Sequence, residues 1–308
     1  MTKTRLTTLL WAIGLTFSLY GQVITQMARE NTQVPRGEKP SAEPPTGRPV
    51  DIVVDTTSLY YVMIDSAQIS IDEGNYEKAE RCIRRALAAE PHHPNNAMML
   101  SNLGTLQRYR GDLEGAVKNY TLALDLTPNA VTLLLNRAAA YVQQGNVAAA
   151  LRDYGRVREL DPTDVESRYS LGMIAVELRQ FSEAEQLFDE IKKINPQSGL
   201  AAEGLGLMYK QQGQYDKAID YLSQVLRQTK DSRLMASRAD CYLALKQLNL
   251  AEDDIRNALA ERNDDPYLYI LRAKLHKLRF SRADMERDID QAVNLGLDRD
   301  LAKQLIGE

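Results

Sequence analysis

The composition of this 308-residue chain is that of a soluble folded protein, with 44% hydrophobic and 26% charged residues. Its formal net charge of −4 comes without any long run of lysine or arginine, which excludes the electrostatic footprint that nucleic-acid binding requires. Aromatic residues make up only 6% of the chain, which favours packing from small and medium side chains over one large aromatic core.

Residues 1–21 have the pattern of a secretory signal peptide. Lys3 and Arg5 form a short basic region, and the uncharged apolar stretch of residues 6–20 follows it. A membrane-spanning helix needs roughly 20 apolar residues, so cleavage after Gly21 is the leading interpretation and an uncleaved membrane anchor is the alternative. The first predicts an exported protein, periplasmic or secreted. The second predicts one anchored in the inner membrane and facing the periplasm.

Residues 22–58 are predicted to form a Pro-rich, flexible linker. Five prolines fall in the stretch from Pro35 to Pro49, mixed with glycines and charged residues. Such a composition cannot bury enough apolar surface to offset the conformational entropy that folding would remove. We therefore expect a partly extended tether ahead of the folded part of the chain.

A pattern with a period of about 34 residues runs through residues 59–299. Glycine, or a residue in its place, recurs with spacings of 37, 34, 34, 34 and 33 residues. An alanine stands five residues after each of these positions, and a large apolar residue stands four residues further on. The three sets are Gly74, Gly111, Gly145, Arg179, Gly213 and Lys246; Ala79, Ala116, Ala150, Ala184, Ala218 and Ala251; and Ile83, Tyr120, Tyr154, Phe188, Leu222 and Ile255.

This pattern is typical of stacked pairs of antiparallel helices. Glycine supplies the left-handed backbone that ends the first helix of a pair, and alanine lets the two backbones approach where the helices cross. The large residue one turn later lies on the same face. Prolines in the following loops, at Pro91, Pro128, Pro162 and Pro196, end the second helix. Because one pair cannot bury its apolar face alone, neighbouring pairs must stack.

The repeated unit resembles the tetratricopeptide repeat (TPR) family, of the exported bacterial type. The segment from Leu103-Gly104 to Pro128 carries the Leu-Gly pair, the turn glycine and the crossing alanine of that family. The resemblance implies an all-α fold, a right-handed superhelical solenoid of about seven antiparallel helix pairs. We place these repeats at residues 60–93, 97–130, 131–164, 165–198, 199–231, 232–265 and 266–299, followed by a capping helix at 300–308.

The sequence contains no motif for catalysis, for a cofactor or for a metal ion. No phosphate-binding glycine loop, serine-nucleophile motif or zinc-protease motif occurs. His92 and His93 are adjacent in a loop between repeats, without cysteine or paired carboxylates at ligand spacing, which predicts a solvent-exposed turn. We therefore expect a protein that is not an enzyme and that uses neither cofactor nor metal.

In the family that the chain resembles, the first helices of successive repeats line a concave groove that binds peptides or partner helices. The groove-facing positions, transferred to this chain, predict a partner-binding set: Asn102, Arg108, Tyr109, Asn136, Gln143, Tyr169 and Lys210. Amides can pair with a peptide backbone, and tyrosine and arginine are frequent interface anchors.

Asn136 resembles the clamp asparagine of chaperone-binding family members. The rest of that clamp is missing, because Ser101 and Thr105 stand where lysine and asparagine are expected. A carboxylate-terminated peptide would meet no cationic pair at those positions. This argues against a cytosolic heat-shock co-chaperone, as does the predicted export signal.

The leading hypothesis is a non-catalytic protein–protein interaction scaffold of the bacterial cell envelope. One alternative is a module that binds glycan or peptidoglycan; it would need a platform of Trp and Tyr, and the one tryptophan, Trp11, lies in the predicted signal. Another is a membrane-tethered assembly factor that keeps residues 1–21. The expected partners are other proteins, with no nucleic acid and with membrane contact only through the N-terminal segment.

Overall fold

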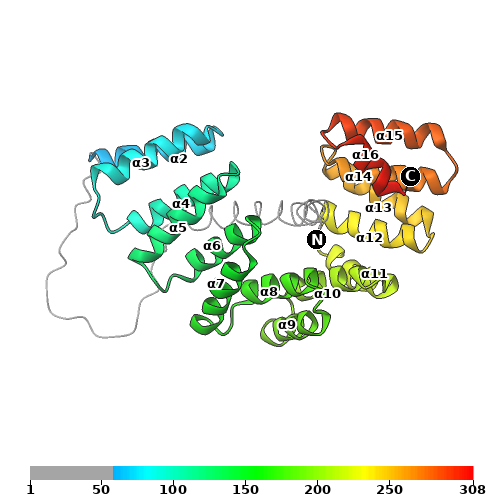
Figure 1. Cartoon of the computed structure of the whole chain (residues 1–308), viewed down its shortest axis with the longest axis horizontal. Helices are drawn as coiled ribbons and strands as arrows, with labels where there is room; N and C mark the ends of the chain where they lie inside the picture. The colour runs from blue at the N-terminus through cyan, green and yellow to red at the C-terminus, as the bar shows by residue number, and fades with distance from the viewer. Residues whose placement is uncertain (1–57, 308) are drawn as a thin grey trace. The chain divides into compact units, whose positions relative to one another are not determined.

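The computed structural model describes residues 58–307, and in that part of the chain it contains 15 helices and no strand (Figure 1). The described residues divide into two compact units, 58–162 and 163–307, which we call the N-terminal and C-terminal units. The predicted signal peptide and nearly all of the predicted linker lie outside the described residues. Among residues 58–307, none of the helices has the length and apolar character needed to cross a bilayer.

The helices follow one another as antiparallel pairs, which confirms the all-α helix-pair fold expected from the repeats. The pairs of the N-terminal unit are α2 (Leu59–Asp72) with α3 (Tyr76–Ala89), α4 (Asn96–Tyr109) with α5 (Leu113–Leu126), and α6 (Val131–Gln143) with α7 (Val147–Leu160). Those of the C-terminal unit are α8 (Val165–Glu177) with α9 (Phe181–Ile194), α10 (Gly199–Gln211) with α11 (Tyr215–Leu226), α12 (Ser232–Ala244) with α13 (Leu248–Glu261), and α14 (Pro266–Leu278) with α15 (Arg282–Asn294). A last helix, α16 (Arg299–Ile306), follows them.

A residue with left-handed backbone ends the first helix of every pair. Four of these turns use glycine, with φ between +72° and +81°: Gly74, Gly111, Gly145 and Gly213. In the C-terminal unit, Arg179, Lys246 and Phe280 make the same turn with φ of 59°, 57° and 60°. For a residue with a β-carbon, this conformation is less favourable in free energy by about 1–2 kcal/mol. The sequence pattern identified Arg179 and Lys246 as glycine substitutes but missed Phe280, because the seventh repeat has Met285 in place of the crossing alanine.

Aromatic rings fill the places where neighbouring helices approach most closely. Phe188 of α9 packs against both α8 and α10, where a β-carbon at Gly172 would come within 2.5 Å of its ring and one at Gly204 within 2.3 Å. Tyr120 of α5 packs on Gly104 of α4, where an added β-carbon would lie 2.9 Å from the ring. These glycines are therefore needed for packing and not for backbone freedom.

Three helix pairs contain an arginine–aspartate ion pair in addition to the large apolar residue of the second helix. The pairs, with the shortest N–O distance of each, are Arg137–Asp153 at 2.8 Å, Arg238–Asp254 at 2.7 Å and Arg272–Asp288 at 2.6 Å. The arginine stands where other repeats have the leucine of the Leu-Gly pair, and the aspartate follows it by 16 residues. The aspartates are buried. Three of the seven repeats thus add a polar contact to the apolar one between their two helices.

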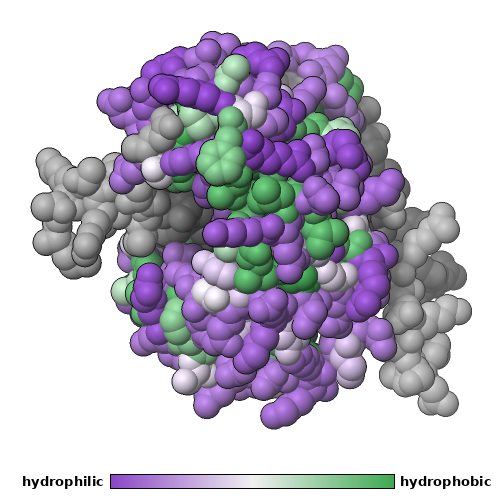
Figure 2. Space-filling model, turned by 90° about the vertical axis from the view of Figure 1, so that its right-hand side faces the viewer, coloured by the Kyte–Doolittle hydropathy of each residue, from purple (hydrophilic) through white to green (hydrophobic). Residues whose placement is uncertain are grey.

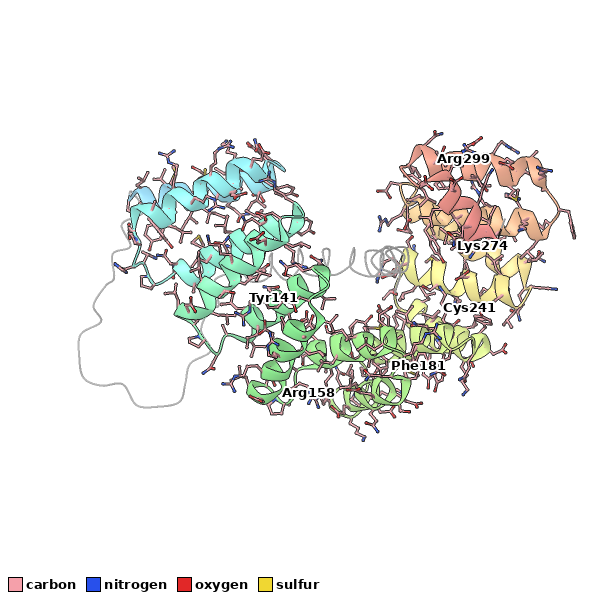
Figure 3. All side chains as sticks on the ribbon, viewed as in Figure 1. Tyr141, Arg158, Phe181, Cys241, Lys274 and Arg299 are labelled. Carbon is pink, nitrogen blue, oxygen red and sulfur yellow. The ribbon has the colours of Figure 1, made fainter. Side chains whose placement is uncertain are left out.

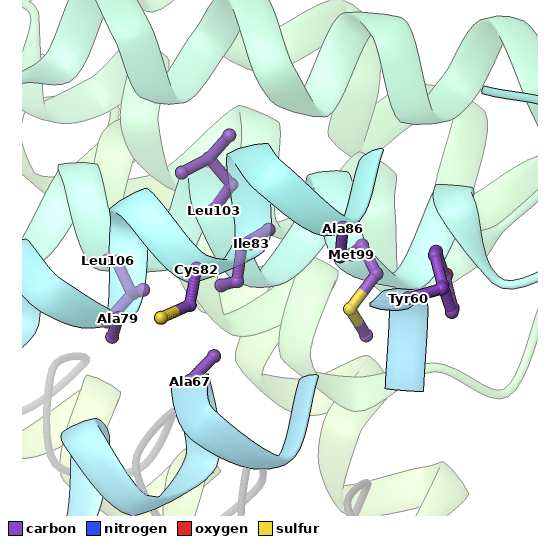
Figure 4. Close-up of a cluster of buried hydrophobic side chains, with 9 residues drawn as sticks. All are labelled: Tyr60, Ala67, Ala79, Cys82, Ile83, Ala86, Met99, Leu103 and Leu106. Atoms are coloured by element: carbon purple, nitrogen blue, oxygen red, sulfur yellow. The ribbon is translucent and has the colours of Figure 1, made fainter. Parts of the chain in front are cut away.

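The first and last pairs end differently. In the N-terminal unit, α2, α3 and α4 share a buried cluster that includes Tyr60, Ile83 and Met99 (Figure 4), but the outer side of α2 exposes apolar side chains such as Ile69. In the C-terminal unit, α16 buries Ile306 against α14 and α15. Only the last pair therefore has a helix that covers it within the described residues.

The face that Figure 2 shows is largely hydrophilic, with apolar side chains gathered in its middle. Among the described residues of the C-terminal unit, the large apolar side chains with the most exposure are Leu178, Leu250, Leu278 and Phe280. Phe280 is 95% exposed and sits at a strained turn.

Candidate partner-binding site

Two neighbouring first helices, α4 and α6, carry five of the seven predicted partner-binding residues. Side chains spaced four, three and four residues apart share one side of each helix. We call this the α4–α6 surface; it consists of Met98, Asn102, Thr105 and Tyr109 of α4 and Thr132, Asn136, Ala139 and Gln143 of α6. Apart from Arg108 and Arg137, these two helices contain no charged residue.

The amides of the α4–α6 surface are available for an incoming ligand. The side chains of Asn102, Asn136 and Gln143 are half-buried and form no hydrogen bond with any other described residue. Each amide offers two N–H donors and a carbonyl acceptor. Asn102 and Asn136 occupy the same position in successive repeats, 34 residues apart. The surface therefore presents two equivalent, unpaired amides on adjacent helices.

Apolar side chains flank these amides. Met98 and Tyr109 are each nearly half exposed, and Tyr109 contacts the ring of Tyr76 with a centroid distance of 6.4 Å. A long thioether and an aromatic ring on an exposed surface are the kinds of side chain that anchor protein interfaces. The surface thus combines polar groups that can bind a backbone with apolar groups that can bind side chains.

Arg108 lies beneath this surface, with only 6% of it exposed. Its guanidinium lies next to the hydroxyl of Tyr120, which Thr105 Oγ1 also contacts at 2.9 Å. Burial raises the pKa of Tyr120, and the charge of Arg108 and the hydrogen bond with Thr105 act in the opposite direction. Nε and Nη2 of Arg108 have no hydrogen-bond partner in residues 58–307.

The first helices of the C-terminal unit carry charged side chains that are paired with one another. Lys210 Nζ of α10 lies 3.1 Å from Asp240 Oδ2 of α12, and Lys274 Nζ of α14 lies 3.3 Å from Asp240 Oδ1; Figure 3 labels Lys274 on its helix. The Tyr267 hydroxyl donates to Asp240 at 3.4 Å. Burial alone would raise the pKa of Asp240, but the two lysine charges lower it.

A second set of paired groups joins α8, α10 and α12. The Tyr169 hydroxyl donates to Glu203 Oε1 at 2.8 Å. Arg233 Nη2 lies 3.8 Å from the same carboxylate and 3.1 Å from Asp231 Oδ2. Burial raises the pKa of Glu203, although Arg233 and the Tyr169 hydrogen bond oppose that effect.

The structure thus separates the seven predicted residues into two groups. Asn102, Arg108, Tyr109, Asn136 and Gln143 come together on or beneath the α4–α6 surface, while Tyr169 and Lys210 belong to the C-terminal unit. Arg108 and Tyr169 are buried, and Tyr169 and Lys210 already have intramolecular partners. Their role in partner binding stays a prediction. Sequence reasoning missed Asp240. It directly follows Ala239, which stands in α12 where other repeats have the glycine of the Leu-Gly pair, and this recurring position could have indicated it.

The histidine loop differs from the sequence expectation. His92 is exposed as predicted, but the ring of His93 stacks on Tyr60 with a centroid distance of 3.9 Å, and its Nε2 lies 3.2 Å from the Tyr61 hydroxyl. The two tyrosines of α2 therefore hold His93 in place. In residues 58–307, no cluster of three or more His, Cys, Asp or Glu side chains is arranged to hold a metal ion.

Family models for the tetratricopeptide repeat match residues 59–129, 135–199 and 209–275. The crystal structure of a tetratricopeptide repeat protein from Parabacteroides merdae matches with 30% sequence identity and a TM-score of 0.68, covering 80% of this chain and 97% of its own. The chain belongs to the tetratricopeptide repeat family. No match was found among curated proteins.

Other solved structures show a similar fold at lower identity. Cut9 in the APC/C hetero-tetramer Cut9–Hcn1 matches at 12% identity with a TM-score of 0.63, covering 82% of this chain, which spans about half (56%) of that one. The pilF protein of Pseudomonas aeruginosa matches at 19% identity with a TM-score of 0.55, covering 68% of this chain and 96% of its own. At these identities the likeness concerns the fold.

Proposed function

We propose that this TPR protein is a scaffold that binds an extended peptide segment of a partner protein along the α4–α6 surface. TPR folds support protein–protein interaction in general, and they are typically not catalytic. The observation that carries the proposal is the unpaired state of Asn102 and Asn136, at equivalent positions on adjacent first helices.

An extended peptide exposes N–H and C=O groups that lose their water on binding and need new partners. An asparagine amide can accept from the peptide N–H and donate to the peptide C=O at once. Met98 and Tyr109 lie on the same side of α4 as Asn102 and provide apolar contacts for the peptide side chains. The α4–α6 surface therefore satisfies both requirements of an extended peptide.

The corresponding surface of the C-terminal unit is less suited to a peptide. Asp240 already accepts from two lysines and a tyrosine, and Glu203 already accepts from Tyr169. A ligand there would have to break existing ion pairs before forming new ones. We therefore assign peptide binding to α4 and α6.

The test begins with selection of peptides from a randomised library on the full-length chain. Affinities of the selected peptides are then measured by fluorescence anisotropy for the wild type, Asn102→Ala and Asn136→Ala. Each substitution should weaken binding about tenfold, the effect of one or two lost hydrogen bonds. Asn257→Ala, an exposed amide on α13, is the matched control and should leave affinity unchanged. Selected peptides that bind both asparagine variants as tightly as the wild type would exclude this surface.

We also propose that the protein acts outside the cytoplasm, in the bacterial cell envelope. The support is the basic and apolar pattern of residues 1–21. The test is fractionation of the producing cell followed by mass measurement of the N-terminus. A chain that starts near Gln22 in the periplasm fits the cleaved signal, and an intact chain in the membrane fits the tethered alternative. An intact chain in the cytoplasm contradicts both.

A further inference from the structure

The turn between α14 and α15 presents a large apolar side chain to solvent. Phe280 is 95% exposed, and Leu278, two residues before it, is 38% exposed. Phe280 also has φ of 60°, in the left-handed backbone that disfavours any residue with a β-carbon. Neither burial nor backbone preference therefore accounts for a phenylalanine at this turn. An exposed aromatic residue in strained backbone points instead to a function at the surface.

Cationic side chains flank this ring. Lys246 makes the equivalent turn in the preceding repeat, and Arg282 is the first residue of α15. Both are exposed, and neither forms an ion pair with any other residue in the described part of the chain. Arg279 donates to Glu252 near the start of α13 at 2.8 Å, which joins the α14–α15 turn to the neighbouring α12–α13 turn. We call this set the turn surface; it consists of Lys246, Leu278, Arg279, Phe280 and Arg282.

The carboxylates of the two neighbouring segments, residues 244–254 and 278–287, already interact with arginines. Four of them form ion pairs, and the fifth, Glu286, interacts with the charge of Arg299. The four pairs are Glu252–Arg279, Asp253–Arg256, Asp254–Arg238 and Asp284–Arg287. The charges of Lys246 and Arg282 are therefore not balanced within residues 58–307. The turn surface has an excess of positive charge, although the chain as a whole carries −4.

The turn surface lies on one side of the C-terminal unit. The α12–α13 and α14–α15 turns both lie on the right-hand side of that unit in Figure 1. Figure 2 views the molecule from that side and shows apolar side chains among hydrophilic ones. An apolar ring at a projecting turn, with cations beside it, can meet a flat surface without rearrangement of the fold.

We propose that the turn surface binds an anionic lipid membrane, with the Phe280 ring entering the boundary between headgroups and acyl chains. Phenylalanine and leucine side chains are favoured at that boundary. Lys246, Arg279 and Arg282 then lie next to lipid phosphates, which attract basic residues at a membrane surface. This contact is separate from the α4–α6 surface and from the predicted N-terminal signal or anchor.

Two features favour a membrane over a second copy of the chain or another protein. In a symmetric contact between two copies, the same patch meets itself, so the unpaired cations of Lys246 and Arg282 would face like charges. A protein partner would need a pocket shaped to the ring together with carboxylates for the cations. A membrane needs no pocket, and it supplies phosphates wherever the ring enters.

The test places a fluorescent probe at residue 280 of the full-length chain. Trp11 is the one tryptophan of the sequence, so Trp11→Phe combined with Phe280→Trp leaves a single emitter. Vesicles of phosphatidylcholine with about one-third phosphatidylglycerol provide the anionic surface. On their addition, the emission should move to shorter wavelength and should be quenched by bromine-labelled acyl chains. An emission that vesicles leave unchanged overturns the proposal.

The matched control places the same probe at another exposed apolar position. Leu126→Trp in the Trp11→Phe background is suitable, because Leu126 is 58% exposed at the end of α5 and has Asp125 beside it. This probe should show neither change, even if residues 1–21 hold the chain on the vesicle. Quenching as strong at residue 126 as at residue 280 would mean that the turn surface has no special contact with lipid, which overturns the proposal.

A second arm tests the cations in the chain that carries the probe at residue 280. Lys246→Gln and Arg282→Gln should each weaken binding to the anionic vesicles about fivefold, and phosphatidylcholine vesicles should give almost no signal. Lys193→Gln, which removes an exposed cation from α9, should leave the signal unchanged. A signal independent of phosphatidylglycerol and of both cations overturns the proposal. A shift that appears without vesicles and grows with protein concentration assigns the ring to a second copy and also overturns it.

Discussion

The pairs α4–α6 and α10–α12 have the same architecture but distribute their charges differently. In both, the first helix has a cation, Arg108 or Lys210, four residues after the glycine of its Leu-Gly pair. In both, the following repeat contains a buried arginine–aspartate pair. In α10–α12 the cation Lys210 is neutralised by Asp240, while in α4–α6 the equivalent position is Ala139 and the amides beside it are unpaired. One surface satisfies its polar groups internally, and the other leaves its amides without hydrogen bonds to any other described residue. The comparison shows that equivalent repeats can differ in whether a cation of the first helix is neutralised, through a single residue one repeat away.

The largest effect should come from a contact that the two regions share. Asp153→Ala in the N-terminal unit and Asp254→Ala in the C-terminal unit each leave a partly buried arginine without its bidentate acceptor. We expect each to lower the free energy of unfolding by about 3 kcal/mol, measured by chemical denaturation. Asp253→Ala, which removes a neighbouring exposed carboxylate paired with Arg256, should change it by less than about 0.5 kcal/mol. Equal losses for Asp254→Ala and Asp253→Ala would mean that the buried pair has no special role.

A second prediction concerns the glycines of the closely packed helices. Gly172→Ala should destabilise the chain by about 2 kcal/mol, because the new methyl group would overlap the ring of Phe188. Gly155→Ala in the middle of α7 is the matched control, since no atom lies within 4 Å of an added β-carbon there. It should instead raise the free energy of unfolding by about 1 kcal/mol. If the two substitutions changed stability in the same direction, the packing explanation would be wrong.

Asp240→Ala should create in the C-terminal unit the unpaired cation that the N-terminal unit already has. We expect a loss of about 1–2 kcal/mol at neutral pH, since about a quarter of the carboxylate side chain is exposed. The pKa of Asp240 is lowered in the folded state, so its contribution is present above the unfolded-state pKa of about 4 and is lost as pH falls through the lower folded-state pKa. Unfolding curves from pH 7 to pH 2 should therefore converge for wild type and Asp240→Ala. A constant difference down to pH 2 would contradict the ion-pair assignment.

The smallest effect is expected at the turns, where the two units differ most in sequence. The turns between the two helices of each pair all use glycine in the N-terminal unit, whereas three of them in the C-terminal unit hold Arg179, Lys246 and Phe280 in left-handed backbone. Lys246→Gly and Phe280→Gly should each stabilise the chain by about 1 kcal/mol in thermal or chemical unfolding. Gly213→Ala at the equivalent turn should destabilise it by a similar amount. If Phe280→Gly lowered stability, this exposed ring would have a packing role that the structure does not show.

The sequence by itself determined the family, the all-α fold and the phase of the repeats. The reason is that each helix pair solves the same local problem with the same residue types: a turn that needs φ > 0, a crossing that needs a small side chain, and one large residue a turn later. These requirements recur in register and are visible without coordinates. They identified Arg179 and Lys246 as turn residues even though neither is glycine. Phe280 escaped because its repeat has lost the crossing alanine that marks the register.

Tertiary structure alone decided which predicted site residues are available to a partner. The resemblance placed Arg108, Asn136, Tyr169 and Lys210 on first helices and singled out only Asn136, as a clamp-like asparagine. The structure shows Tyr169 hydrogen-bonded to Glu203 and Lys210 paired with Asp240. Within residues 58–307, Asn136 is unpaired and Arg108 is buried with two unpartnered nitrogens. Whether a polar side chain is satisfied depends on a residue about 30 positions away and on how far each side chain reaches across the helix interface. The period fixes which positions are neighbours, but only packing in three dimensions fixes burial and hydrogen bonding.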